Sequence, residues 1–142
     1  MYSTMMKTIF TLFITSNMLL QQTTLACFLA SKFHIYVINN LPPYTPPLRV
    51  HCQSRNDDLG YHDLVDRGQN FTWSFCESFA VNTLYFCHLW WDNKEKSFDA
   101  FKSNFHIFRL DTYLWYATKD GIYSNADYSQ KVVKKYDWDI IH

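Results

Sequence analysis

Leu48-Arg49-Val50-His51-Cys52-Gln53 and Phe71-Thr72-Trp73-Ser74-Phe75 are the two stretches that decide the fold of this chain. In the first stretch apolar and polar residues alternate, so Leu48, Val50 and Cys52 share one face of an extended strand. In the second stretch three aromatic residues alternate with two small polar ones in the same way. We therefore expect two half-buried β-strands, with Trp73 buried between two sheets.

Further strand-like segments flank these two stretches. Residues 33–38 (FHIYVI) are β-branched and aromatic, and a stiff loop with prolines at positions 42, 43, 46 and 47 follows them. Residues 81–91 (VNTLYFCHLWW) form a continuous apolar run, which is typical of a central strand covered on both faces. The Asp120-Gly121 pair predicts a hairpin. Shorter strands are expected at residues 97–101, 105–110, 112–118, 122–123 and 131–138.

The connections complete the fold prediction. Residues 54–68 (SRNDDLGYHDLVDRG) are polar and contain two glycines, so we expect a long connection there. Turn signals recur at intervals of about eight to twelve residues, without a convincing helical period. This pattern predicts an all-β domain, an antiparallel β-sandwich of about seven strands and of immunoglobulin-like size. A β-barrel stays open as an alternative.

The N-terminus has the pattern of a secretory signal peptide. Residues 8–20 are uncharged and mostly apolar, they follow Lys7, and Thr24 and Ala26 occupy the small-residue positions of a cleavage site. We expect cleavage of residues 1–26 after Ala26, which leaves residues 27–142 as a single mature domain. A membrane anchor or a bacterial lipoprotein signal fits this pattern less well. No later segment is long and apolar enough to span a bilayer, so we expect a secreted, extracellular product without membrane insertion.

The composition argues against several classes of protein. The 142 residues carry 13 basic and 13 acidic side chains, so the basic footprint of a nucleic-acid binder is missing. Three glycines are too few and too far apart for a Rossmann fingerprint or a P-loop. The histidines lack metal-site spacing, the acidic residues at 57, 58, 63 and 66 lack calcium-loop spacing, and no G-x-S-x-G elbow occurs. We expect no nucleic-acid partner, metal, cofactor or catalytic residue, and no enzymatic activity.

Cysteines and one asparagine are candidates for covalent modification. Four cysteines, at positions 27, 52, 76 and 87, predict disulfides in a secreted chain and allow three pairings. Cys52 and Cys87 both lie in strongly β segments, so a bond between them fits strand geometry, with buried free thiols as the alternative. Asn70-Phe71-Thr72 is the only N-x-[ST] motif. It predicts a glycan on a surface-exposed Asn70, unless the triplet is unused.

A set of motifs occurs in the order and spacing of a known family. The motifs are VINN (37–40), LRVHCQS (48–54), DDLG (57–60), FTWSF (71–75), TLYFC (83–87), FDAF (98–101), Trp115 and DGIY (120–123). On these motifs the mature chain resembles the plant self-incompatibility protein S1 family, also called the S-protein homologues. The resemblance implies a small secreted β-sandwich, and founding members act in the pistil as ligands that allow rejection of self pollen. Family members usually carry a later cysteine pair near residues 109–114, which this chain lacks. If Cys52 and Cys87 were each normally paired with one of those later cysteines, both would lack a partner in this chain. A bond between Cys52 and Cys87 avoids this.

Function is expected in the loops, since binding residues concentrate on loops held by a rigid scaffold. The candidate loops are residues 54–68, 92–96 and 119–123. Their contact candidates are Asp57, Asp58, Tyr61, Lys94, Glu95, Lys96 and Tyr123. The leading hypothesis is a monomeric, secreted plant signalling ligand that a cell-surface receptor protein recognises. Two alternatives stay open: a small extracellular hydrolase such as a ribonuclease that uses two histidines, or an apoplastic carbohydrate-binding or defence module.

Overall fold

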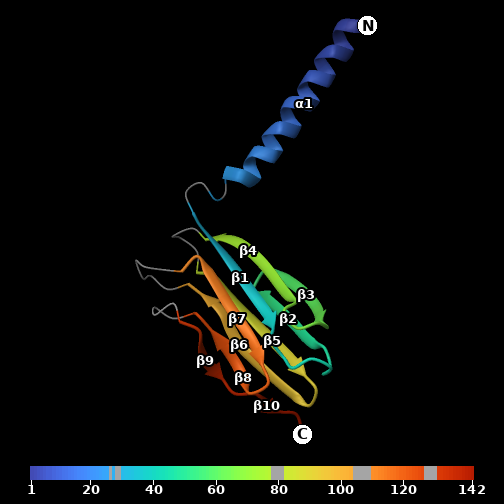
Figure 1. The fold of residues 1–142 in the computed structure, drawn as a ribbon. Coiled ribbons are helices and arrows are strands. Elements are labelled where there is room, and N and C mark those ends of the chain that lie inside the picture. The colour runs from blue at the N-terminus through green and yellow to red at the C-terminus, as the bar shows by residue number, and fades with distance from the viewer. Residues whose placement is uncertain (26, 28–29, 78–81, 104–109, 127–130) are drawn as a thin grey trace.

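The structure, a computed structural model, describes residues 1–25, 27, 30–77, 82–103, 110–126 and 131–142. It contains one helix, α1 (Tyr2–Leu25), and ten β-strands in two five-stranded sheets. Figure 1 shows the sheets packed face to face, with α1 extending away from them. The predicted all-β sandwich is confirmed, and its ten described strands exceed the predicted number.

The two sheets have different strand orders. The first sheet has the order β4-β1-β7-β8-β9, and the second has the order β10-β6-β5-β2-β3. All described neighbours pair antiparallel except β1 and β7, which pair parallel. The strands of the first sheet are β1 (Ser31–Asn39), β4 (Asn70–Glu77), β7 (Thr112–Thr118), β8 (Gly121–Ser124) and β9 (Val133–Tyr136). Those of the second are β2 (Leu48–Ser54), β3 (Asp58–Leu64), β5 (Leu84–Trp91), β6 (Lys94–Lys102) and β10 (Asp139–Ile140).

The core lies between the two sheets and follows the predicted strand phase. Leu48, Val50 and Cys52 are fully buried on the inner face of β2, as their alternation predicts. Three phenylalanines from both sheets meet here: the ring of Phe33 lies 5.8 Å from that of Phe75 and 4.8 Å from that of Phe101. Apolar alternation thus supplies each sheet with one inner face, and burial of these faces drives the sheets together.

Trp73 has the predicted direction but not the predicted burial. It shares the inner side of β4 with its aromatic neighbours, and its ring lies 5.4 Å from that of Phe71 and 5.6 Å from that of Tyr85. The side chain is half-buried. The predicted packing between the sheets is found, but the side chain keeps some exposure because β4 is an edge strand, which has a neighbouring strand on one side only.

Strand β3 lies where a long connection is expected. It pairs with β2 after a tight turn in which the Ser54 amide donates to the Asp57 carbonyl at 2.8 Å. Polar residues suit this strand because it forms the edge of the second sheet and meets water. Gly60 adopts φ +76° within it, and the pairing with β2 carries a bulge. Because of these features the sequence of β3 lacks the regular alternation of apolar and polar residues from which strands are predicted.

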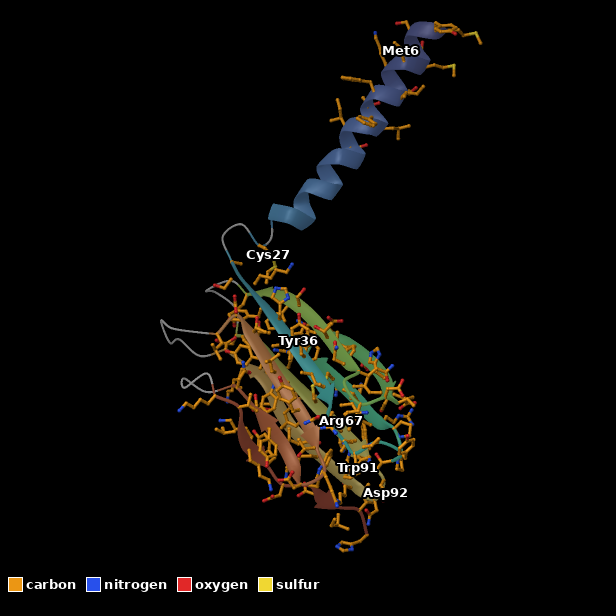
Figure 2. All side chains as sticks on the ribbon, in the orientation of Figure 1. Met6, Cys27, Tyr36, Arg67, Trp91 and Asp92 are labelled. Atoms are coloured by element: carbon orange, nitrogen blue, oxygen red, sulfur yellow. A yellow bond between two sulfur atoms is a disulfide. The ribbon has the colours of Figure 1, made fainter. Side chains whose placement is uncertain are left out.

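Two further predictions are corrected at β5 and β6. β5 is internal to the second sheet, between β2 and β6, but its burial alternates, so only one of its faces is covered. β6 begins at Lys94, so the residues 94–96 belong to a strand and not to a loop. The turn itself consists of Asp92, which adopts φ 54°, and Asn93. Figure 2 labels Asp92 and Trp91 at this end of the sandwich.

The C-terminal part contains the predicted hairpin. β7 and β8 pair antiparallel around Asp120, with Thr118 opposite Gly121. Gly121 adopts φ +154°, and a Cβ atom there would collide with the backbone oxygen of Tyr136 in β9. Within the tail strand expected at residues 131–138, β9 covers residues 133–136, and β10 follows beyond it at residues 139–140. Apart from Leu110, the strand expected at residues 105–110 lies outside the described residues.

Helix α1 occupies the segment for which a signal peptide is predicted. Among the described residues, no helix combines the length and apolar character that a membrane crossing needs. Cleavage after Ala26 stays a prediction.

Candidate functional site

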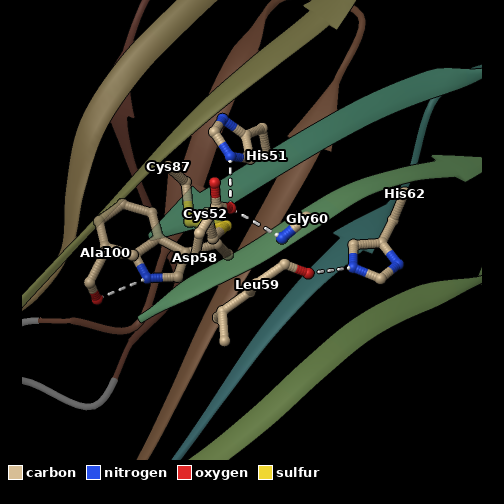
Figure 3. The surroundings of a disulfide bond; sticks show 9 residues. His51, Cys52, Asp58, Leu59, Gly60, His62, Cys87 and Ala100 are labelled. Carbon is tan, nitrogen blue, oxygen red and sulfur yellow. Dashed lines mark hydrogen bonds and ion pairs between the residues drawn. A yellow bond between two sulfur atoms is a disulfide. The ribbon is translucent and has the colours of Figure 1, made fainter. Parts of the chain in front are cut away.

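Two disulfide bonds brace the sandwich. Cys27 and Cys76, with Cα atoms 5.4 Å apart, tie the segment before β1 to the end of β4. Cys52 and Cys87 are direct partners on β2 and β5, with Cα atoms 4.1 Å apart, and both are fully buried (Figure 3). This second bond fixes the register of two neighbouring strands. Successive side chains alternate between the two faces of a strand. The Cys52–Cys87 bond therefore also determines which side chains of β2 and β5 lie next to one another on the outer face of the sheet.

The outer face of the second sheet carries a cluster of rings, which we call the aromatic face. Its register is given by three cross-strand pairs: Arg49 with Trp90, His51 with His88, and His51 with Tyr61. Tyr61 is 59% exposed. The aromatic face consists of Arg49 and His51 from β2, Tyr61 from β3, and Phe86, His88 and Trp90 from β5.

Four of the five rings of the aromatic face contact one another. His51 stacks on Tyr61 with centroids 4.2 Å apart, and His88 stacks on Trp90 with centroids 3.7 Å apart. Tyr61 and Trp90 lie 6.0 Å apart and join the two pairs, while the Arg49 guanidinium lies 5.0 Å from the Tyr61 ring. Such contacts hold the side chains in fixed orientations, so little conformational freedom remains to be lost on binding.

Hydrogen bonds to carboxylates fix both imidazoles. The Nε2 atom of His51 lies 2.8 Å from Asp58 Oδ1, and that of His88 lies 2.8 Å from Glu95 Oε2. Asp58 also accepts a hydrogen bond of 2.9 Å from the Gly60 amide, as Figure 3 shows. The Gly60 amide, followed by His51, lowers the pKa of the Asp58 carboxyl below its ordinary value. Each imidazole is therefore an oriented part of the surface.

Charges surround the aromatic face unevenly. Asp58, Asp63, Glu95 and Asp99 contribute four carboxylates on this side of the sheet, against the cations of Arg49 and Lys102, while the carboxylate of Asp139, which lies opposite Glu95, is neutralised by Lys96 at 3.0 Å. Arg49 and Asp63 form a loose ion pair of 3.8 Å. Asp99 lies opposite Phe86 on β6, and its exposed carboxylate makes no hydrogen bond or ion pair with any described residue. With neutral histidines, the rim has a formal excess of two negative charges.

The structure brings together only some of the residues singled out in the sequence. Tyr61 belongs to the aromatic face, Asp58 and Glu95 lie beside it, and Asp57 belongs to the turn before β3, where its carbonyl accepts from the Ser54 amide. The other three candidates lie elsewhere: Lys94 is 4.8 Å from the Trp91 ring, Lys96 pairs with Asp139 at 3.0 Å, and Tyr123 in the first sheet donates to Asp120 at 2.7 Å. Asn70 is exposed at the start of edge strand β4, where a glycan would reach solvent.

Residues Phe86, His88 and Trp90 are absent from the sequence prediction. The continuous apolar run that contains them indicates burial on both faces, so it gives no reason to look for a surface. The exposed side of β5 follows from the two-layer architecture.

The chain is a small disulfide-bonded β-sandwich with an ordered, exposed aromatic face. Within the described part of the chain, no group of three or more histidine, cysteine, aspartate or glutamate side chains is arranged to hold a metal ion. The sequence matches the family described as "Plant self-incompatibility protein S1" over residues 34–138. The chain therefore belongs to the plant self-incompatibility protein S1 family.

Curated relatives agree with this assignment. S-protein homolog 24 of Arabidopsis thaliana is 41% identical over 92 residues, which is 64% of this chain and 61% of the relative. S-protein homolog 29 of the same plant is 32% identical over 108 residues, 76% of this chain and 78% of the relative. The matched region thus spans about three fifths of the first relative's length.

A solved structure of a self-incompatibility protein homologue superposes with a TM-score of 0.61 at 20% identity, over 77% of this chain and 96% of that one. Its title describes a widespread family of small, highly stable, secreted proteins from plants.

Proposed function

We propose that this protein is a secreted, monomeric, non-enzymatic signalling ligand of a plant, which a cell-surface receptor recognises through the aromatic face. The observation that carries the proposal is the exposed aromatic face on a sheet whose register a buried disulfide fixes. Tyrosine, tryptophan and arginine are the residues that dominate binding energy at protein interfaces, and Tyr61, Trp90 and Arg49 lie together here.

Secretion has its own support. The N-terminal segment has the pattern of a signal peptide, and both disulfides need an oxidising compartment. The related solved structure is described as a secreted plant protein.

The arrangement of the side chains bears on the two alternatives. In a ribonuclease-like hydrolase the imidazole nitrogens must reach the substrate; Nε2 of His51 and of His88 are both engaged with carboxylates, so such a reaction would have to use Nδ1 of each ring, and the RNA assay below decides it. A carbohydrate-binding platform needs free ring faces, whereas the stacked pairs cover ring faces with one another. The position of the contact surface also differs from the loops expected from sequence. Of the expected loops, residues 54–68 contribute Tyr61 and Asp58 and residues 92–96 contribute Glu95, whereas residues 119–123 lie in the first sheet.

The test is saturable binding of fluorescently labelled mature protein to intact cells from the tissues of the plant that makes it. We expect binding that competes with unlabelled protein and disappears after protease treatment of the cells. Trp90→Ala and Tyr61→Ala should each weaken it by about tenfold or more, the loss typical of residues central to an interface. Tyr44→Ala is the matched control, because Tyr44 is a fully exposed tyrosine in the loop between β1 and β2.

Absence of saturable binding in every tissue tested would refute the receptor-ligand function. Loss of RNA in the presence of the protein, abolished by His51→Ala or His88→Ala, would instead establish the hydrolase. Binding to a glycan array without any cell response would establish the carbohydrate-binding module.

A further inference from the structure

Strand β5 presents apolar side chains along the length of its outer face. Leu84 and Phe86 are 41% and 38% exposed, and the half-buried His88 and Trp90 continue the row. In the described strands, the large apolar side chains exposed to this degree are Tyr61, Leu84, Phe86, Val133 and Ile140, so three of the five lie on this one side of the second sheet. A contiguous apolar row inside a polar rim is the surface pattern of a protein contact.

The charges around this row select among partners. The carboxylates of Asp63 and Asp99 are exposed on opposite sides of it, at positions set by pairing with Arg49 on β2 and with Phe86 on β5. Their field repels the phosphates of nucleic acids and of anionic lipid headgroups. It also opposes a face-to-face pair of two copies of this chain, because each acidic rim would then meet its own equivalent.

We propose that the occupant of the aromatic face is a protein surface with an apolar centre and a rim of lysine or arginine side chains. This inference rests on the proposed receptor-ligand function and adds the chemistry of the receptor's contact site. The apolar centre covers Phe86, Trp90 and Tyr61, which the sandwich leaves open. The basic rim pairs with carboxylates such as Asp99, which has no hydrogen-bond or ion-pair partner among the described residues.

The test reverses charges on the rim in the same cell-binding assay. We expect Asp99→Lys to weaken binding at least tenfold at low salt and to reduce its dependence on salt, because rim charges act mainly on association. Asp63→Lys should act in the same direction. Asp111→Lys is the matched control, since Asp111 is an exposed carboxylate just before β7 of the first sheet, and its binding should stay within twofold of wild type. Thermal unfolding of each variant verifies that the exposed substitutions leave the fold intact.

The outcomes separate the two proposals. Saturable wild-type binding that Trp90→Ala weakens and Asp99→Lys leaves unchanged would keep the function and overturn the basic-rimmed partner. Tighter binding by Asp99→Lys would overturn it as well, in favour of an acidic partner. A dimer in sedimentation that Trp90→Ala dissociates would assign the aromatic face to a second copy. Absence of saturable wild-type binding would overturn both proposals.

Discussion

Replacing Cys52 and Cys87 together by alanine should destabilise the mature protein severely. The bond joins residues separated by 35 positions. Loop-closure entropy for a loop of that size is roughly 13 cal/mol/K, so its loss amounts to about 4 kcal/mol at 25 °C. This is a large fraction of the ~5–15 kcal/mol by which domains of this size are stable. It corresponds to a fall of about 15 °C in Tm for a domain of this length.

A matched variant removes the other disulfide. Cys27 and Cys76 are separated by 49 positions, so loop closure alone gives a similar value, again about 4 kcal/mol. The two sites differ in burial, since Cys52 and Cys87 are fully buried at the centre of the second sheet and Cys27 is only half-buried. Loss of two sulfur atoms from the core adds a packing term at the first site alone. The Cys52/Cys87 variant should therefore be the less stable of the two, although its loop is shorter.

The assay is guanidinium and thermal unfolding of both double variants and wild type under non-reducing conditions, followed by circular dichroism and tryptophan fluorescence. Thiol titration of each protein verifies that the remaining disulfide has formed. A loss of less than about 1 kcal/mol for the Cys52/Cys87 variant would refute the loop-closure reasoning. Equal losses for the two variants would refute the packing term.

Four further predictions follow from single positions. Trp115→Phe should cost about 1–3 kcal/mol in guanidinium unfolding, because the buried indole donates to the Ala100 carbonyl at 3.0 Å and phenylalanine leaves that oxygen unpaired. Gly121→Ala should cost about 1–3 kcal/mol by forcing β8 from β9, whereas Gly60→Ala, with no atom within 4 Å of its new Cβ, tests backbone strain alone. The pKa of Asp58 is lower in the folded protein than in the unfolded chain, so the ionised carboxylate stabilises the fold at pH values above its unfolded-state pKa. This stabilisation is lost as the pH falls through the folded-state pKa. Below about pH 4 the Tm of wild type should therefore fall more steeply than that of Asp58→Asn. N-terminal sequencing of secreted material should begin at Cys27, and a retained Met1 or a start beyond Phe28 would disprove the cleavage site.

Local patterns in the sequence were sufficient to predict the fold class and several strand phases. Alternation in residues 48–53 identifies the buried side of β2, and the Asp120-Gly121 pair identifies the β7–β8 hairpin, since both signals depend on neighbouring residues only. Edge strands were harder to predict. Water can hydrogen-bond the free backbone groups along their outer edges, so polar residues are tolerated there and the apolar alternation is weaker. This is why β3 resembled a connection. Lys94, Glu95 and Lys96 resembled a loop for a different reason: they are charged residues that directly follow the Asp92-Asn93 turn, although β6 is an internal strand there, paired with β5 and with the two-residue strand β10.

The aromatic face could not be found from the sequence alone. It becomes evident only when the apolar composition of β5 is compared with the two-layer architecture of the fold. Residues 84–91 are apolar on both sides, which is the composition of a strand in a three-layer protein, but a two-layer sandwich can bury only one side of any strand.

The outer side chains of β5 therefore add little to the core, and exposed apolar rows carry a risk of aggregation. Stability alone gives no reason for Phe86 and Trp90 to be there. The same strand supplies Cys87, whose bond to Cys52 fixes the register that places His51 opposite His88 and Arg49 opposite Trp90. A single covalent link thus stabilises the core on one side of the sheet and orders the rings on the other, and that coupling gives the proposed contact surface a fixed arrangement of side chains.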